Sequence, residues 1–256
     1  MRIISMERAE DERELGQKIT FSTNFQNQVH WRDFASLDTH QASLADQLEL
    51  SGIHYHYRDA DSIPDPDDEN FDFQEALLAL ACLESDASCD FCAKAQSNRQ
   101  ALASPEKVYP EPYPSRYQRL FRPNRPAEHV WRAVQVLRAV KARMTENVRQ
   151  SDGQRKAFFK DAKYLVAHML FIRKEPHKGT TLILTPAEVE AVRNETDIIS
   201  EALWASYDAE VTLNTRSPAS VFSSATECRF LKGKTMQRLT ARPTAISQTD
   251  GNPSQS

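Results

Sequence analysis

Hydrophobic residues recur at spacings of three and four through most of the second half of the chain, the pattern of helices with one buried face. The pattern predicts helices over residues 127–150, 154–172, 185–207 and 218–232. The third has a strong start signal, because Thr185 can cap it, Pro186 takes the first helical position and Glu188 the third. Residues 126–235 are therefore expected to form a helical domain.

The first 60 residues show a different pattern, of short strands around one helix. The strand candidates are Arg2–Ser5, Lys18–Ser22 and Ile53–Tyr57. A helix is expected before the last strand, since Asp38 and Gln41 have capping-box spacing and Gly52 stands where a left-handed C-terminal cap belongs. These elements bury little and the first strand begins almost at Met1, so residues 1–60 are interpreted as a partial α/β segment, the end of a sheet domain truncated upstream.

Residues 61–125 are expected to join these two regions. Their acidic, proline-containing start predicts a loop from Asp59 to Asp72, and Asp72 with Glu75 then begins one helix. A connection rich in proline and tyrosine follows, and the polar residues 236–256 are expected to be a disordered tail. The predicted fold class is α+β and predominantly α-helical, with a small N-terminal strand and helix remnant before a helical bundle-like region.

Composition narrows the class of protein. The chain has 32 Lys plus Arg, 36 Asp plus Glu and a formal net charge of -4, so nucleic-acid binding would need a local basic patch. No apolar run reaches the roughly 18 residues of a membrane helix and no signal-peptide pattern occurs, so we expect a cytoplasmic protein without a membrane partner. There are only 6 glycines and neither GxGxxG nor GxxxxGK(S/T), so no cofactor is expected.

The most distinctive stretch is TNFQNQVHWRDFASLD at residues 23–38. Residues 24–33, called the amide loop here, hold the candidate binding residues Asn24, Gln26, Asn27, Arg32 and Asp33. Amides can pair with base edges or backbone groups, and an arginine can hold a phosphate. The alternative is structural: Asn24 and Asn27 would form turns, and Arg32 and Asp33 an ion pair at the helix entrance. Chemistry alone favours this structural alternative.

The cysteines offer only a weak metal site. Cys82, Cys89 and Cys92 could supply three thiolates to zinc, with Cys228 or a histidine as the fourth ligand. Cys82, however, fits the apolar face of a helix, and a second ligand pair at zinc-site spacing is absent. We therefore expect no bound metal, and CDFC is not placed to open a helix as a redox pair does.

No catalytic residue is assigned. His54 and His56 alternate with tyrosines and share one face of a strand, but no activated serine or cysteine stands beside them in the sequence. His168 is interpreted as a packing residue inside a helix. The arginines of residues 127–150 are dispersed around their helix, which predicts a solvated face and not a DNA-binding ridge. No convincing PD-x(n)-ExK arrangement is found.

The order of several motifs resembles the AIPR family, the abortive phage infection proteins of bacteria. The likeness spans roughly residues 2 to 235 and consists of TNFQN, VHWRDFASLD, a following Gln41, GIHYHYR, EALLALAC, YQRLF from Tyr117 to Phe121, HVWRAVQVLRAV and SVFSSATECRFLK. The resemblance implies a bacterial anti-phage role. It also implies upstream regions in longer members, one similar to a restriction-type nuclease and one with an NGxQT-like segment.

Both upstream regions are missing here, so we interpret the chain as a C-terminal portion, either truncated or a separately encoded half. The leading hypothesis is a non-catalytic recognition or regulatory module of a phage-defence protein. Its partner would be a separately encoded upstream half or a defence-system effector, and nucleic acid is a further candidate ligand. The alternative is a metal-dependent nuclease of the same defence class with an unrecognised active site.

Overall fold

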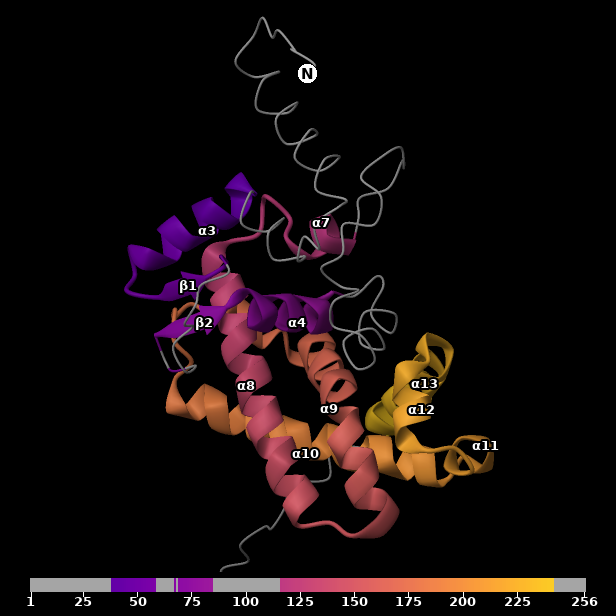
Figure 1. Cartoon of the computed structure of the whole chain (residues 1–256). Coiled ribbons are helices and arrows are strands. Elements are labelled where there is room, and N and C mark those ends of the chain that lie inside the picture. Colours follow the sequence, from indigo (N-terminus) through magenta and orange to yellow (C-terminus); the bar gives the residue numbers. More distant parts are fainter. Residues whose placement is uncertain (1–37, 59–66, 68, 85–115, 242–256) are drawn as a thin grey trace, which may run out of the picture.

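The computed structural model describes residues 38–58, 67, 69–84 and 116–241 (Figure 1). In these residues helices dominate and a parallel pair of short strands forms the sheet, which confirms the predicted fold class. The elements are α3 (Thr39–Glu49), β1 (His54–His56), β2 (Asn70–Asp72), α4 (Phe73–Leu83), α7 (Arg116–Leu120), α8 (Ala127–Arg149), α9 (Gly153–Lys174), the 3-10 helix η2 (Pro176–Lys178), α10 (Pro186–Asp208), α11 (Val211–Asn214), α12 (Pro218–Ser223) and α13 (Ala225–Ala241).

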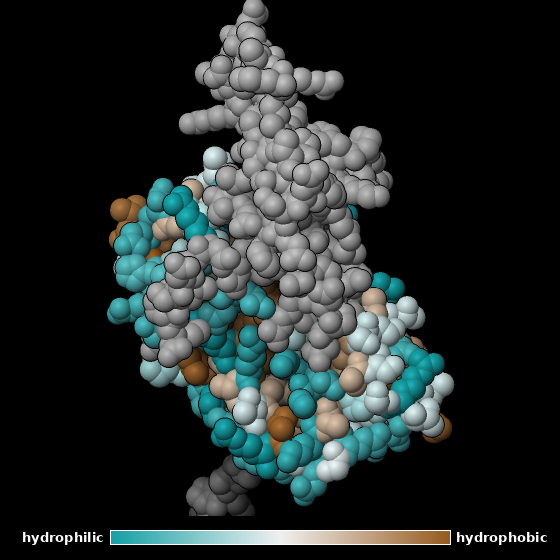
Figure 2. All heavy atoms as spheres, in the orientation of Figure 1, coloured by the Kyte–Doolittle hydropathy of each residue, from teal (hydrophilic) through white to brown (hydrophobic). Residues whose placement is uncertain are grey.

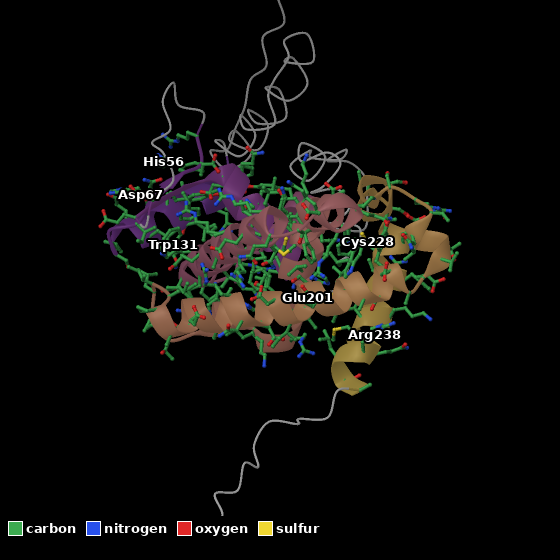
Figure 3. All side chains as sticks on the ribbon, turned by 90° about the horizontal axis from the view of Figure 1, so that it is seen from below. His56, Asp67, Trp131, Glu201, Cys228 and Arg238 are labelled. Atoms are coloured by element: carbon green, nitrogen blue, oxygen red, sulfur yellow. The ribbon has the colours of Figure 1, made fainter. Side chains whose placement is uncertain are left out.

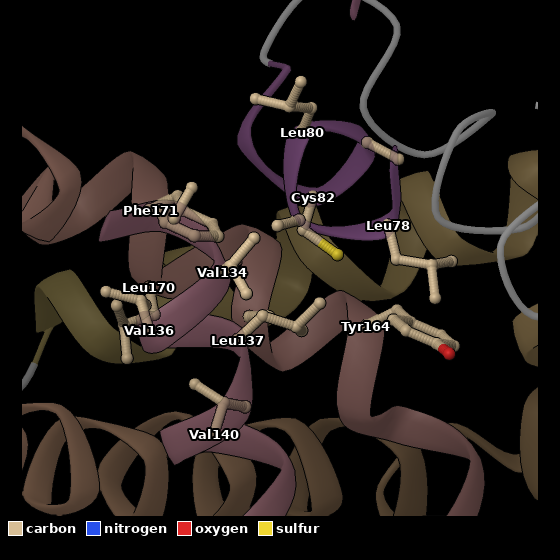
Figure 4. Packing of buried hydrophobic residues seen from close by; sticks show 14 of the residues in the cluster. Leu78, Leu80, Cys82, Val134, Val136, Leu137, Val140, Tyr164, Leu170 and Phe171 are labelled. Carbon is tan, nitrogen blue, oxygen red and sulfur yellow. The ribbon is translucent and has the colours of Figure 1, made fainter. Parts of the chain in front are cut away.

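Three long helices form the centre of the fold. α8 and α9 run antiparallel on either side of a short turn, α10 crosses both, and α4 packs against α8 and α9 (Figure 1). Leu80 and Cys82 of α4, Val134 and Leu137 of α8 and Phe171 of α9 are all buried at this junction (Figure 4). Within the described ranges, no helix is both apolar and long enough to cross a membrane.

The described segments share one continuous hydrophobic core. Its residues run from Leu44 in α3 to Leu239 in α13 and include almost the whole of α4. The helix α4 is buried on every side because its sequence, FQEALLALACL, has small and apolar residues all round. The domain boundaries drawn from the sequence stay predictions.

Two helices begin as their sequence signals predict. The Glu188 backbone N–H donates to the Thr185 hydroxyl at 3.3 Å, and the Thr185 N–H donates to Glu188 Oε2 at 2.8 Å, which closes the capping box of α10. The Asp72 carboxylate accepts a hydrogen bond of 2.7 Å from the Glu75 N–H at the start of α4. These short motifs therefore fix where α10 and α4 begin.

The predicted loop over residues 59–72 is wrong at its end, where Asn70–Asp72 form β2. β2 pairs in parallel with β1, and Tyr55 lies opposite Phe71. The Phe71 ring is fully buried, with its centroid 4.7 Å from that of Tyr55 and 5.0 Å from that of Trp131 in α8. One buried aromatic side chain thus outweighs the acidic composition that predicts a loop.

The last predicted helix, residues 218–232, is two helices. The chain leaves the helical conformation at Ser224, where φ is -98° and ψ is 117°. The Ser224 carbonyl accepts from the Cys228 N–H at 2.9 Å, so the second helix, α13, starts there. α13 continues to Ala241, and residues 236–241, predicted as part of the disordered tail, are helical.

Two arginines of α8 do not lie on the predicted solvated face. Arg132 is 1% exposed, and its guanidinium donates to Pro176 O at 3.0 Å and to Glu188 Oε1 at 2.6 Å. The Arg143 guanidinium donates hydrogen bonds to both carboxylate oxygens of Asp197, at 2.8 and 2.6 Å. Because Glu188 and Asp197 lie on α10, Arg132 and Arg143 hold α8 to α10.

Candidate functional site: a tyrosine and amide network at the start of α3

The predicted binding residues lie outside the described part of the chain. They are Asn24, Gln26, Asn27, Arg32 and Asp33, and their role as recognition or turn residues stays a prediction. The described chain begins at Asp38, the last residue of the same motif. Asp38 meets polar side chains from two other family-like motifs, and this cluster is the candidate site.

The cluster consists of Asp38, Gln41, Tyr55 and Tyr117, and is called the Asp38 network here. The Tyr117 hydroxyl donates to Asp38 Oδ2. It also accepts a hydrogen bond of 2.9 Å from Gln41 Nε2. The Tyr55 hydroxyl donates to Gln41 Oε1 at 2.6 Å. Each group thus has a partner of the opposite kind, and residues far apart in the sequence are joined in one chain of hydrogen bonds.

Local structure explains why the side chains of Asp38 and Gln41 are available for the Asp38 network. Asp38 caps α3 through Oδ1, which accepts from the His40 N–H at 2.8 Å and leaves Oδ2 for Tyr117. The predicted capping box is wrong in its second half, because the Gln41 side chain turns inward to the tyrosines and is fully buried. The C-terminal cap is confirmed, since Gly52 has φ +74° at the end of α3.

Packing of the two tyrosine rings fixes the hydroxyl positions. Tyr55 projects from β1 toward the core and stacks on Phe71, as described above. Tyr117 lies in the short helix α7, where its ring centroid is 5.2 Å from that of Phe121 and 6.3 Å from that of Phe73. The network therefore couples α3, β1 and α7 to the hydrophobic core.

Both tyrosines stay protonated under ordinary conditions. Burial raises the pKa of Tyr117 well above its usual value, and the hydrogen bond to Asp38 raises it further. Burial also raises the pKa of Tyr55, with a smaller contribution from Tyr117. A neutral hydroxyl with a raised pKa is a hydrogen-bond donor and a poor nucleophile or base. The chemistry that this cluster supports is therefore the positioning of Asp38 and the start of α3.

A second buried polar contact lies between α4, α9 and α13. His168 is fully buried, and its Nδ1 is 2.8 Å from the Cys82 carbonyl oxygen, which can only accept, so Nδ1 carries the proton. Nε2 is then the acceptor for Lys232 Nζ at 3.4 Å. Burial lowers the pKa of His168 to about 4, which keeps the ring neutral. The interpretation of His168 as a packing residue is confirmed.

The cysteines of the metal hypothesis are only partly described. Cys82 is fully buried in α4, and the Cys228 thiol donates to Phe222 O at 3.4 Å. Cys89 and Cys92 lie outside the described residues. Within the ranges that the structure describes, no three His, Cys, Asp or Glu side chains gather as metal ligands. The absence of a metal at these cysteines stays a prediction.

The two histidines of β1 face away from the core. Tyr55 and Tyr57 are buried, while His54 is exposed and lies 2.8 Å from Glu49 across the turn. His56 is half-buried. The pattern confirms that both imidazoles share the outer face of the strand. No described serine or cysteine is hydrogen-bonded to either ring.

Sequence reasoning missed the role of Gln41, Tyr55 and Tyr117. All three stand in motifs of the family-like pattern, but nothing in their spacing indicates that they meet, because 76 residues separate Gln41 from Tyr117. A signal was present in the pattern itself: tyrosine hydroxyls and a glutamine amide beside apolar residues have to find partners when they are buried.

The fold and the network define a predominantly helical protein with one parallel strand pair and a buried polar cluster assembled from separate motifs. The family model of the AIPR protein matches residues 1–211, and the chain belongs to the AIPR family, the abortive-infection class of phage-defence proteins. The matched residues stop before the stretch at 220–232 that also resembles the family. No curated protein and no solved structure matches the chain.

Proposed function

We propose that the chain is a non-catalytic recognition module of an abortive-infection system, and that the amide loop is its recognition element. The supporting observation is the Asp38 network. It attaches Asp38 to the hydrophobic core through Tyr117 and the start of α3. Asp38 is the last residue of the motif that contains Asn24, Asn27 and Arg32. A fixed attachment lowers the conformational entropy that a binding loop loses when it engages a partner.

The chemistry of the loop determines the class of partner. Three amides and an arginine close together in the sequence can pair with polar groups of fixed geometry, such as backbone amides or carboxylates. On this proposal the partner is a separately encoded half of the defence system or an effector protein, and binding controls that partner. The network residues support the loop and do not react.

The test separates positioning from general stability. Tyr117→Phe removes the bond to Asp38 and the acceptor for Gln41, and should lower the free energy of unfolding by about 1 to 2 kcal/mol. The control is a substitution in the distant core of α8, Val140→Ala, studied at a temperature where both variants are equally folded. Bacteria that produce each variant are challenged with phage, and plaques are counted.

We expect Tyr117→Phe to lose more protection than Val140→Ala at equal folded protein. Equal protection by the two variants would show that the network acts only through stability. Cleavage of plasmid DNA by the purified wild-type chain with magnesium would instead favour the nuclease alternative.

A further inference from the structure

α13 presents an outer face that the packing of the fold leaves exposed. Its inner face is buried through Cys228, Leu231, Thr235 and Leu239, and α13 packs against α10 and α12. The outer face, called the α13 face here, consists of Arg229, Phe230, Lys234, Gln237 and Arg238, all of which are exposed. Figure 3 shows Arg238 on the end of α13 that extends past α10 in that view.

The α13 face is positively charged in a chain whose net charge is negative. Residues 225–241 hold Arg229, Lys232, Lys234 and Arg238 against one acid, Glu227. Glu227 is itself committed to an ion pair with Arg216. Among the described residues, no carboxylate forms an ion pair with Arg229, Lys234 or Arg238.

Several cations of the other basic helices are paired with acids. On α9, Arg155 pairs with Glu201 and Arg173 pairs with Glu195 at 2.7 Å, both on α10. The acidic α10 thus pairs with Arg143, Arg155 and Arg173, and it forms no ion pair with the cations of the α13 face.

An exposed aromatic ring lies within this charge. Phe230 is 44% exposed, and Lys234 Nζ is 5.4 Å from its ring centroid. Gln237 and Arg238 follow one turn further along the same side of the helix. On the coloured part of the surface in Figure 2, hydrophobic residues are scattered among hydrophilic ones.

We infer that the α13 face binds single-stranded nucleic acid. Arg229, Lys234 and Arg238 would contact successive phosphates, and the Phe230 ring would stack on an unpaired base. Cations without acidic neighbours give the phosphate attraction, and the exposed ring favours a strand whose bases are free to stack. This inference is independent of the amide loop and of its proposed partner.

The test uses the full chain and a fluorescein-labelled oligodeoxythymidine of about 20 nucleotides, longer than the site of one small domain. Binding is followed by fluorescence anisotropy over a series of salt concentrations. The variant Arg229→Gln/Lys234→Gln/Arg238→Gln should weaken binding by about tenfold or more and reduce the slope of log affinity against log salt by about 2.

A matched control removes three exposed cations elsewhere. Arg149→Gln/Lys156→Gln/Lys160→Gln changes the net charge by the same amount on α8 and α9 and leaves the α13 face intact. We expect this control to bind within about twofold of wild type at physiological salt, where the Debye length is about 8 Å.

Phe230→Ala tests the stacking and should weaken single-strand binding by about fivefold or more, with the salt slope unchanged. Equal losses in the two triple variants, or no binding by wild type, would overturn the site. Tighter binding of a duplex of the same length, together with no effect of Phe230→Ala, would overturn the single-strand assignment.

Discussion

Arg132 shows how one buried side chain organises the connection between α9 and α10. Its guanidinium reaches Pro176 O, the Thr181 hydroxyl at 2.9 Å and Glu188, so the chain from η2 to the start of α10 closes around it. Gly179 passes so near that a Cβ there would lie 2.0 Å from Arg132 Nη2. Gly179 has an ordinary negative φ of -64°, so its backbone conformation would allow a side chain. The close approach of Arg132 is what excludes one.

Gly179→Ala should therefore lower the free energy of unfolding by about 2 to 4 kcal/mol, because the buried guanidinium cannot move without leaving donors unpaired. Gly233→Ala in α13 is the control, since a Cβ there meets nothing within 4 Å. Alanine favours a helix, so this control should be neutral or more stable by up to about 1 kcal/mol. Urea unfolding measures both. Similar losses for the two variants would contradict the role of the contact.

His168 predicts how stability depends on pH. Its folded pKa is about 4 and the ordinary value is 6.5, so the unfolded chain binds more protons between these two values. Stability should thus fall as the pH drops from about 6.5 to about 4, with a contribution from this residue of about 3 kcal/mol at most. His177, whose pKa burial also lowers to about 4, acts in the same direction.

The variant His168→Asn isolates one contribution, because an amide can still donate to Cys82 O and carries no titrating group. Its free energy of unfolding should change less between pH 7 and pH 4 than that of wild type. Urea denaturation at several pH values measures this. The same pH dependence in both proteins would show that His168 is not the titrating group.

At the scale of elements, the start of α13 has a signal that periodicity alone overlooks. Ser224 and Glu227 have the spacing of a serine cap followed by glutamate, and the Glu227 N–H donates to Ser224 Oγ at 3.4 Å. Ser224→Ala should cost about 1 kcal/mol, and Ser224→Asp should retain most of the stability. Ser220→Ala, at an exposed position within α12, is the control. Thermal unfolding of the three variants would show no difference if Ser224 is not a cap.

How well each element could be predicted depends on how far apart in the sequence its contacting residues lie. The starts of α10 and α4 depend on residues three apart, so Thr185 and Asp72 reveal them. β2 depends on Phe71 reaching Trp131 across 60 residues, and nothing local in an acidic segment shows that contact. Arg132 likewise has the local pattern of a surface residue, and only its distant acceptors make burial favourable.

The candidate site follows the same rule. Asp38 was recognised as a cap because its hydrogen bond to His40 is local. The inward turn of Gln41 depends on Tyr55 and Tyr117, which the sequence cannot place in space without the fold. Sequence reasoning therefore identified the segment that leads into the network but not the network itself.

At the scale of the whole molecule, the core extends beyond the family match. The match ends at residue 211, yet Phe222 and Leu231 are buried, and the Phe222 ring centroid lies 5.1 Å from that of Phe158 in α9. A chain ending at residue 211 should expose this part of α9 and α10 and lose several kcal/mol of stability. A chain ending at Ala241 should unfold at the wild-type temperature. Equal melting temperatures for both truncations would show that α12 and α13 do not belong to the core.

The most direct test of the central claim is phage protection by the variant Asn24→Ala/Asn27→Ala. If the amide loop recognises a partner, efficiency of plating should rise to that of unprotected bacteria, while stability changes by no more than about 1 to 2 kcal/mol. Ser220→Ala, at an exposed position of α12 outside the amide loop, is the control and should leave protection unchanged. Equal protection by wild type and the double variant, at matched amounts of folded protein, would contradict recognition by the loop.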